Sequence, residues 1–66
     1  MKEYDSVKLL KDFDGIRLGT RGAIVSDYTE AFDVEFFDTD GDTIDVVTVP
    51  AELLELVHSF DRKRGY

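Results

Sequence analysis

The stretch from residue 32 to residue 49 constrains the fold of this chain more than any other. Residues 32–38, FDVEFFD, alternate apolar and acidic side chains, which is typical of a strand with one buried face. Residues 42–49, DTIDVVTV, are rich in β-branched residues, which favours a second strand. Asp40 and Gly41 lie between the two, and this pair predicts a type I′ hairpin turn, which needs positive φ at both central residues.

The alternation also assigns the side chains of this hairpin to two faces. Phe32, Val34 and Phe36 are expected to face the core, and Asp33, Glu35 and Phe37 the solvent. Curvature of the sheet that buries both Phe36 and Phe37 is an alternative. A two-residue turn would set Phe36 opposite Asp45, so a bulge or a longer loop also remains open.

Weaker signals elsewhere complete an all-β pattern. They predict a strand at 5–11, a loop at 12–20 covering Phe13, Ile16 and Leu18, a strand at 21–28, a helical turn within 51–56, and a short strand at 56–60. This order predicts a small five-stranded SH3-like barrel with one short helical turn near the C-terminus. We expect a single domain over residues 1–60 and a basic, frayed tail over residues 61–66.

Composition narrows the class of protein further. The chain has 66 residues and no cysteine, so disulfides and thiolate metal sites are excluded. The N-terminus has no apolar run of signal-peptide length, and no segment has the roughly 18 apolar residues of a membrane helix. We therefore expect a cytoplasmic protein without a membrane partner.

The charge is acidic and unevenly distributed. The net charge is -7, and the eight basic residues all lie at or before Arg21 or after Asp61. Solubility alone is one explanation for this charge. Complementarity to a basic partner is the other. Eleven carboxylates follow one another without a lysine or arginine between them: Asp27, Glu30, Asp33, Glu35, Asp38, Asp40, Asp42, Asp45, Glu52, Glu55 and Asp61.

The aspartates around Gly41 do not fit a calcium loop. An EF-hand needs glycine at loop position 6 and glutamate at position 12, with a helix on each side. Counted from Asp38, those positions hold Thr43 and Val49, and the flanks favour strands. We expect no metal and no cofactor.

Catalysis and direct nucleic-acid binding are also disfavoured. The single histidine, His58, lies on an apolar stretch, and asparagine, glutamine and cysteine are absent. A nucleophile, a base and an orienting group are therefore not evident, and we expect no enzymatic activity. Direct binding of nucleic acid requires a basic surface, which a net charge of -7 does not provide.

Residues 5–57 contain D-x-V-x-L, G-x-x-G-x-I-V and V-E-F-x-D-x-D-G segments, then a threonine-containing apolar strand and an A-E-x-L turn. In this series they resemble the bacterial domain-of-unknown-function family 4926, whose members show the same segments. The counterparts here are Asp5, Val7 and Leu9; Gly19, Gly22, Ile24 and Val25; Val34, Glu35, Phe36, Asp38, Asp40 and Gly41; Thr48; and Ala51, Glu52 and Leu54. The resemblance implies a small SH3-like barrel, and it does not imply an activity.

The sequence thus favours a non-enzymatic binding protein whose acidic surface meets a basic protein. The most specific hypothesis is an immunity protein or antitoxin that neutralises a toxin or a nucleic-acid-handling enzyme. The alternatives are a phage-type anti-defence inhibitor that mimics nucleic acid and a structural accessory module. The residues expected to bind the partner are Asp27, Glu30, Asp33, Glu35, Phe37, Asp38, Asp40, Asp42 and Asp45.

Overall fold

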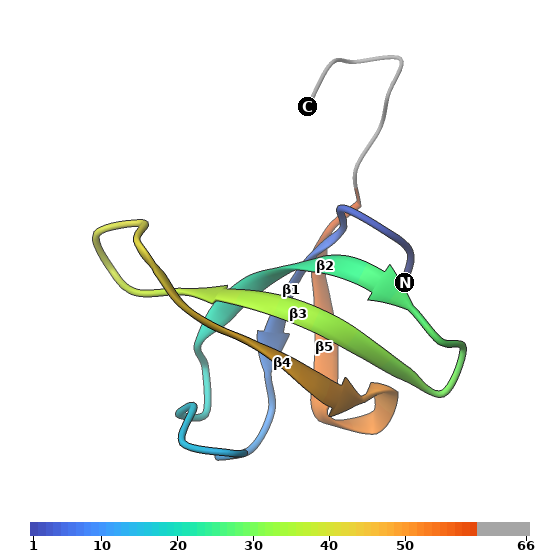
Figure 1. Cartoon of the computed structure of the whole chain (residues 1–66), viewed down its shortest axis with the longest axis horizontal. Coiled ribbons are helices and arrows are strands. Elements are labelled where there is room, and N and C mark those ends of the chain that lie inside the picture. The colour runs from blue at the N-terminus through green and yellow to red at the C-terminus, as the bar shows by residue number, and fades with distance from the viewer. Residues whose placement is uncertain (60–66) are drawn as a thin grey trace.

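A five-stranded antiparallel sheet forms the domain in the computed structural model, which describes residues 1–59 (Figure 1). Its elements are β1 (Ser6–Leu9), β2 (Arg21–Asp27), β3 (Ala31–Phe37), β4 (Thr43–Pro50), a 3-10 turn (Ala51–Leu53) and β5 (Leu54–His58). The strand order is β4-β3-β2-β1-β5, so a meander from β1 to β4 is followed by a return that places β5 beside β1. The predicted all-β class, the five strands and the short helical turn are confirmed.

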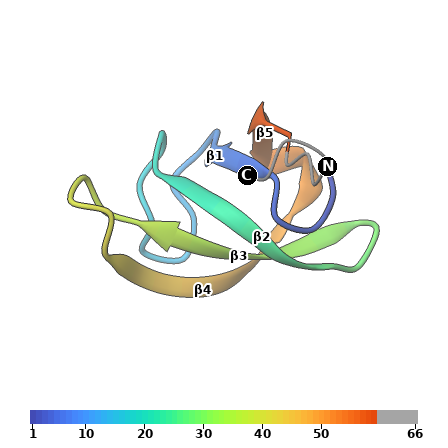
Figure 2. The ribbon, with the colours of Figure 1, turned by 90° about the horizontal axis from the view of Figure 1, so that it is seen from above.

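The sheet curls around the apolar core (Figure 2). On β3, the expected core side chains Phe32, Val34 and Phe36 are all buried. β4 and β5 are the two edges, and no pairing within residues 1–59 joins them. The curled sheet is compatible with the predicted SH3-like barrel. The core consists of Val7, Leu9, Ile16, Ile24, Phe32, Val34, Phe36, Val47, Val49 and Leu54.

β2 and β3 come into close contact at Gly22, which pairs with Phe36. A Cβ atom at this position would lie 2.6 Å from the backbone oxygen of Glu35 and 2.7 Å from Val34 Cγ1. Real Cβ atoms essentially never lie that close to other atoms. A larger residue would therefore push β2 away from β3.

The turn between β3 and β4 is not the predicted type I′ turn. Gly41 has a φ of +87°, but Asp40 does not have a positive φ. Asp38 N donates to Asp42 O at 2.9 Å, and Gly41 N donates to Asp38 O at 3.0 Å. These bonds close a three-residue loop, the pattern of a type I turn followed by a left-handed glycine. The prediction was wrong because it weighed Asp40 and Gly41 alone and not the side chain of Asp38, which stabilises the longer loop.

A register shift between Phe36 and Phe37 accompanies the longer loop. Phe37 pairs with Thr43 and Phe36 pairs with Asp45, which leaves Ile44 as the extra residue of a bulge. The open question of register is therefore answered: the hairpin has a longer loop and a bulge, and Phe36 still lies opposite Asp45.

The loop between β1 and β2 is fixed by its own hydrogen bonds. Phe13 N and Ile16 N donate to each other's carbonyl oxygens at 2.9 and 2.8 Å. Ile16 is buried and Phe13 partly buried, as expected, but Leu18 is 63% exposed. The expectation that Leu18 lies under the loop was wrong. Leu18 N donates a hydrogen bond to Asp12 Oδ1 at 2.7 Å, and both residues are exposed, so this part of the loop lies at the surface.

The last strand begins earlier than predicted. β5 starts at Leu54, directly after the 3-10 turn, whereas the sequence suggested residues 56–60. The predicted basic tail, residues 61–66, lies outside the described residues. Within residues 1–59, no helix has the length and apolar character needed to span a bilayer.

Replacing Gly22 with alanine should lower the free energy of unfolding by about 1–3 kcal/mol, the usual cost of extra volume at a packed site. Gly41→Ala is the comparison, because nothing lies within 4 Å of a Cβ there and only its φ of +87° is unfavourable. Urea denaturation should show the larger loss for Gly22→Ala. A loss no greater than that of Gly41→Ala would contradict the importance of the β2–β3 contact.

Candidate functional site

The acidic residues expected to bind a partner occupy four places in the fold. They are the β2–β3 turn (Asp27 and Glu30), the outer face of β3 (Asp33 and Glu35, with Phe37), the β3–β4 turn (Asp38, Asp40 and Asp42) and β4 (Asp45). The two turns lie at opposite ends of β3 (Figure 1). A strand of seven residues, Ala31–Phe37, separates them by about 20 Å. The structure therefore brings the β3 face next to the β3–β4 turn but does not bring the two turns together.

Asp38 has a structural role in the β3–β4 turn. Its Oδ1 atom accepts hydrogen bonds from Asp40 N at 2.9 Å and from Asp42 N at 3.0 Å. Aspartate often accepts backbone N–H groups a few residues ahead in this way and so stabilises a turn. Folding therefore explains Asp38, which the sequence reasoning had assigned to partner binding alone.

Asp40 and Asp42 form the exposed end of the same turn. Both residues are exposed, and neither makes an ion pair with any of residues 1–59. Figures 1 and 2 show this hairpin end extending beyond the rest of the sheet. We call Asp40 and Asp42 the acidic tip; they are free to meet a partner while Asp38 keeps the turn in shape.

Asp33 is held in place on the outer face of β3. Tyr28 OH donates to its Oδ2 at 2.8 Å, and Thr48 Oγ1 donates to its Oδ1. The hydrogen bond from Thr48, followed by that from Tyr28, holds the pKa of Asp33 below its ordinary value. The same hydrogen bond to Asp33 raises the pKa of the Tyr28 hydroxyl. Asp33 is therefore a fixed negative charge at neutral pH.

Glu35 lies next to Asp33 on this face and adjoins apolar side chains. Thr43 Oγ1 donates to Glu35 Oε2 at 2.7 Å. Val46 on β4 pairs with Glu35 on β3 and is 52% exposed. Phe36 is fully buried and Phe37 partly buried, an outcome between the two alternatives that the sequence left open. The outer face thus combines two oriented carboxylates with accessible apolar surface.

Asp45 and Asp27 have different surroundings. Asp45 lies opposite the buried Phe36, so it is on the core side of the edge strand β4, although it is exposed there. An inward charge on an edge strand discourages pairing with another chain. Asp27 Oδ1 accepts a hydrogen bond from Thr29 N at 2.7 Å and so stabilises the β2–β3 turn. Thr29 has a φ of 76° in this turn.

The two ion pairs found among residues 1–59 lie away from these acidic residues. Lys2 Nζ lies 2.9 Å from Asp5 Oδ1, and Lys8 Nζ lies 3.9 Å from Glu55 Oε2. Asp5 is only 1% exposed, and its Oδ2 also accepts a hydrogen bond from Lys2 N at 2.9 Å. Sequence reasoning missed this buried carboxylate, although Asp5 alternates in step with Val7 and Leu9 and so falls on their buried face.

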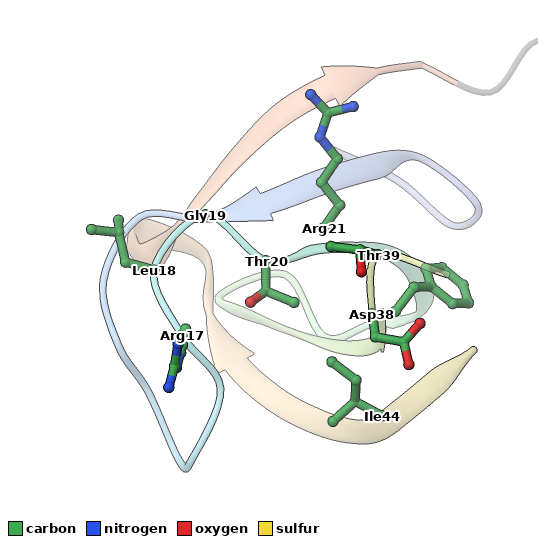
Figure 3. Close-up of a pocket in the computed structure, with 9 residues that line it drawn as sticks. Arg17, Leu18, Gly19, Thr20, Arg21, Asp38, Thr39 and Ile44 are labelled. Atoms are coloured by element: carbon green, nitrogen blue, oxygen red, sulfur yellow. The ribbon is translucent and has the colours of Figure 1, made fainter. Parts of the chain in front are cut away.

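An open groove of about 750 Å³ runs between the loop before β2 and the base of the β3–β4 hairpin (Figure 3). Arg17 and Arg21 line it, and neither makes an ion pair with any of residues 1–59. Sequence reasoning also missed this feature, because segments far apart in the chain form it. The full lining is Arg17, Leu18, Gly19, Thr20, Arg21, Phe37, Asp38, Thr39 and Ile44.

Among residues 1–59, no group of three or more histidine, aspartate or glutamate side chains is arranged to hold a metal ion. The carboxylates of the β3 face and of the acidic tip are hydrogen-bond acceptors with negative charge. Their natural counterparts are lysine and arginine side chains, which donate to carboxylates in strong, charge-assisted hydrogen bonds.

One comparison with known proteins gives a match. The family model described as "Domain of unknown function (DUF4926)" matches residues 3–56. No curated protein and no solved structure matches the chain. The resemblance noted in the sequence is thereby confirmed over nearly the whole described domain.

Asp38→Ala should lower the free energy of unfolding by about 1 kcal/mol, because two backbone N–H groups lose their acceptor. Asp38→Asn keeps a side-chain oxygen and should cost less. Asp40→Ala, the matched control in the same turn, should change stability by less than about 0.5 kcal/mol. Chemical denaturation measures all three variants, and equal stability of Asp38→Ala and Asp40→Ala would contradict the role of Asp38.

The lowered pKa of Asp33 links it to stability at low pH. Because its pKa is lower in the folded state, ionised Asp33 stabilises the fold above its unfolded-state pKa, and this contribution is lost as the pH falls through its folded-state pKa. Thr48→Val removes the stronger hydrogen bond and should raise the pKa of Asp33 toward its ordinary value. Tyr28→Phe should raise it less.

An NMR titration of the Asp33 carboxyl carbon measures these pKa values directly. The two variants should also lose less stability than the wild type on acidification. A wild-type pKa for Asp33 in the Thr48→Val variant would show that this hydroxyl does not stabilise the carboxylate.

Proposed function

This chain belongs to the domain-of-unknown-function family DUF4926, and since that description assigns no activity, we propose from its surface that it is a non-enzymatic binding protein for a basic partner. The proposed contact is the acidic tip together with the outer face of β3. Asp40 and Asp42 enter a basic cleft of the partner, and Asp33 and Glu35 meet its rim.

One observation carries this proposal: no carboxylate from Asp27 to Asp45 makes an ion pair with any of residues 1–59. Like charges close together on paired strands repel and lower stability. Folding gives a use for Asp27 and Asp38, which accept backbone N–H groups, but gives none for Asp40 and Asp42. A partner with lysine or arginine side chains would neutralise the remaining charges.

Rigidity of the hairpin supports the same proposal. The carboxylate of Asp38 and the backbone bond from Gly41 N to Asp38 O fix the turn before any partner arrives. The hydroxyls of Thr48 and Thr43 orient Asp33 and Glu35. Carboxylates that are already positioned lose little conformational entropy on binding, which favours affinity.

The most specific form of the proposal is an immunity protein or antitoxin of the cytoplasm. A toxin that acts on nucleic acid or on a phosphorylated ligand has a basic active site, because its substrate is negatively charged. A protruding acidic hairpin complements such a site in shape and charge. Blocking the site requires no catalytic group in the inhibitor.

The decisive variant is Asp40→Lys/Asp42→Lys, which reverses the acidic tip and leaves Asp38 in place to hold the turn. A partner is first identified by affinity capture from the native host, and surface plasmon resonance then measures its binding at two salt concentrations. The variant should bind more than about 10-fold more weakly, mainly through slower association. Added salt should weaken the wild type more than the variant.

The matched control is Glu3→Lys/Glu52→Lys, which changes the net charge equally at exposed positions away from the hairpin. This control should bind within about threefold of wild type, because distant exposed charges are screened. An equal loss of affinity in both variants would show that the acidic tip acts only through the net charge of the protein. Wild-type binding by the tip variant would refute the proposed contact.

A further inference from the structure

The groove beside the hairpin has two edges of opposite charge. Arg17 and Arg21 belong to the loop edge. Asp38 belongs to the hairpin edge, and the acidic tip, Asp40 and Asp42, begins two residues later in the chain. Figure 3 shows Arg17 and Leu18 on one side of the groove and Asp38 and Ile44 on the other.

Within the described residues 1–59, the two arginines are cations without an acidic partner, in a protein of net charge -7. Lys2 and Lys8 each lie within 4 Å of a carboxylate, whereas Arg17 and Arg21 have no such neighbour among residues 1–59. An arginine carries five N–H donors suited to carboxylates. Their charge is therefore available to an acidic group from another molecule.

Each charged edge also carries an exposed apolar side chain, Leu18 beside Arg17 and Ile44 beside Asp38. Leu18 is 63% exposed and Ile44 is 50% exposed, and both line the groove. Two hydrogen bonds fix the backbone at Leu18 and the next residue: Leu18 N donates to Asp12 Oδ1 at 2.7 Å, and Gly19 N donates to Leu9 O at 2.7 Å. Ile44 is the extra residue of the β4 bulge.

We propose that this groove is the interface of a symmetric dimer of this chain. A two-fold axis along the groove sets Leu18 of one copy against Ile44 of the other. The acidic tip of each copy then meets Arg17 and Arg21 of its partner. Such an interface uses the same surface twice and must be self-complementary, which a positive edge opposite a negative edge provides.

The charge pattern favours a second copy over other occupants. A uniformly acidic segment would bind Arg17 and Arg21 but would be repelled by the acidic tip beside them. A uniformly basic segment would bind the acidic tip but would be repelled by Arg17 and Arg21. A second copy rotated by half a turn presents both signs in the required order.

The dimer is expected to be weak and reversible. A standard protein interface buries about 800 Å² on each partner, which is about 18% of the 4553 Å² surface of this domain. That is a large share for one groove and its tip to supply. The net charge of -7 on each copy also opposes association. At physiological salt the screening length is about 8 Å, so this long-range repulsion is reduced while the direct ion pairs persist.

Self-association would cover the acidic tip. A copy in the dimer cannot place Asp40 and Asp42 in a basic cleft, so dimerisation and the proposed partner binding exclude each other. The dimer itself is inferred from the groove alone and requires no partner.

Two charge reversals test the interface with the protein alone. Sedimentation equilibrium in about 150 mM NaCl, from about 10 µM to 1 mM protein, should show a concentration-dependent dimer for the wild type. Asp40→Lys/Asp42→Lys and Arg17→Glu/Arg21→Glu should each be monomeric, because each homodimer would oppose like charges. An equimolar mixture of the two variants should restore the dimer, because both contacts are then between opposite charges.

Glu3→Lys/Glu52→Lys is the control, with the same change in net charge outside the groove, and should dimerise at least as well as wild type. Circular dichroism confirms that each variant is folded. A monomeric wild type at 1 mM, or a mixture of the two variants that stays monomeric, would overturn the proposal. Arg17→Glu/Arg21→Glu keeps the acidic tip, so a failure of the dimer and a failure of the proposed partner contact are separable.

Discussion

The close contact of β2 with β3 at Gly22 is the constraint on which the rest of this structure depends. It places Gly22 opposite Phe36 and Ile24 opposite Val34, at the centre of the core. The same strand β3 carries Asp33 and Glu35 on its other face. The position of the acidic surface is therefore set by the packing of the core, and a change that moves β3 alters both.

Local patterns in the sequence predicted that five strands exist, although β5 begins two residues earlier than expected. They failed where a side chain or a distant segment decides the outcome. Alternation along β3 placed Phe36 in the core correctly, because one strand with one buried face leaves little choice. The Asp-Gly pair suggested the wrong turn, because the carboxylate of Asp38 favours a longer loop. The groove of Arg17 and Arg21 joins segments about 20 residues apart in sequence, and its existence depends on the tertiary fold.

Two groups of aspartates in the loops of this domain have different physical roles. Asp12, Asp27 and Asp38 accept backbone N–H groups and stabilise loops. Asp40 and Asp42 have no such side-chain bond among residues 1–59 and lie exposed at the end of a hairpin. Net charge alone therefore overstates the surface available to a partner, and the acidic tip is a smaller and more specific feature than the composition suggests.

The order of the strands also determines when the sheet is completed during synthesis. Strands β1 to β4 are consecutive in the chain and each pairs with the next, so they can form a meander as the chain leaves the ribosome. The second edge of β1 pairs with β5 and stays uncovered until that strand follows. An uncovered edge invites pairing with other nascent chains. β1 has only four residues, Ser6–Leu9, and its shortness limits the backbone exposed during that interval.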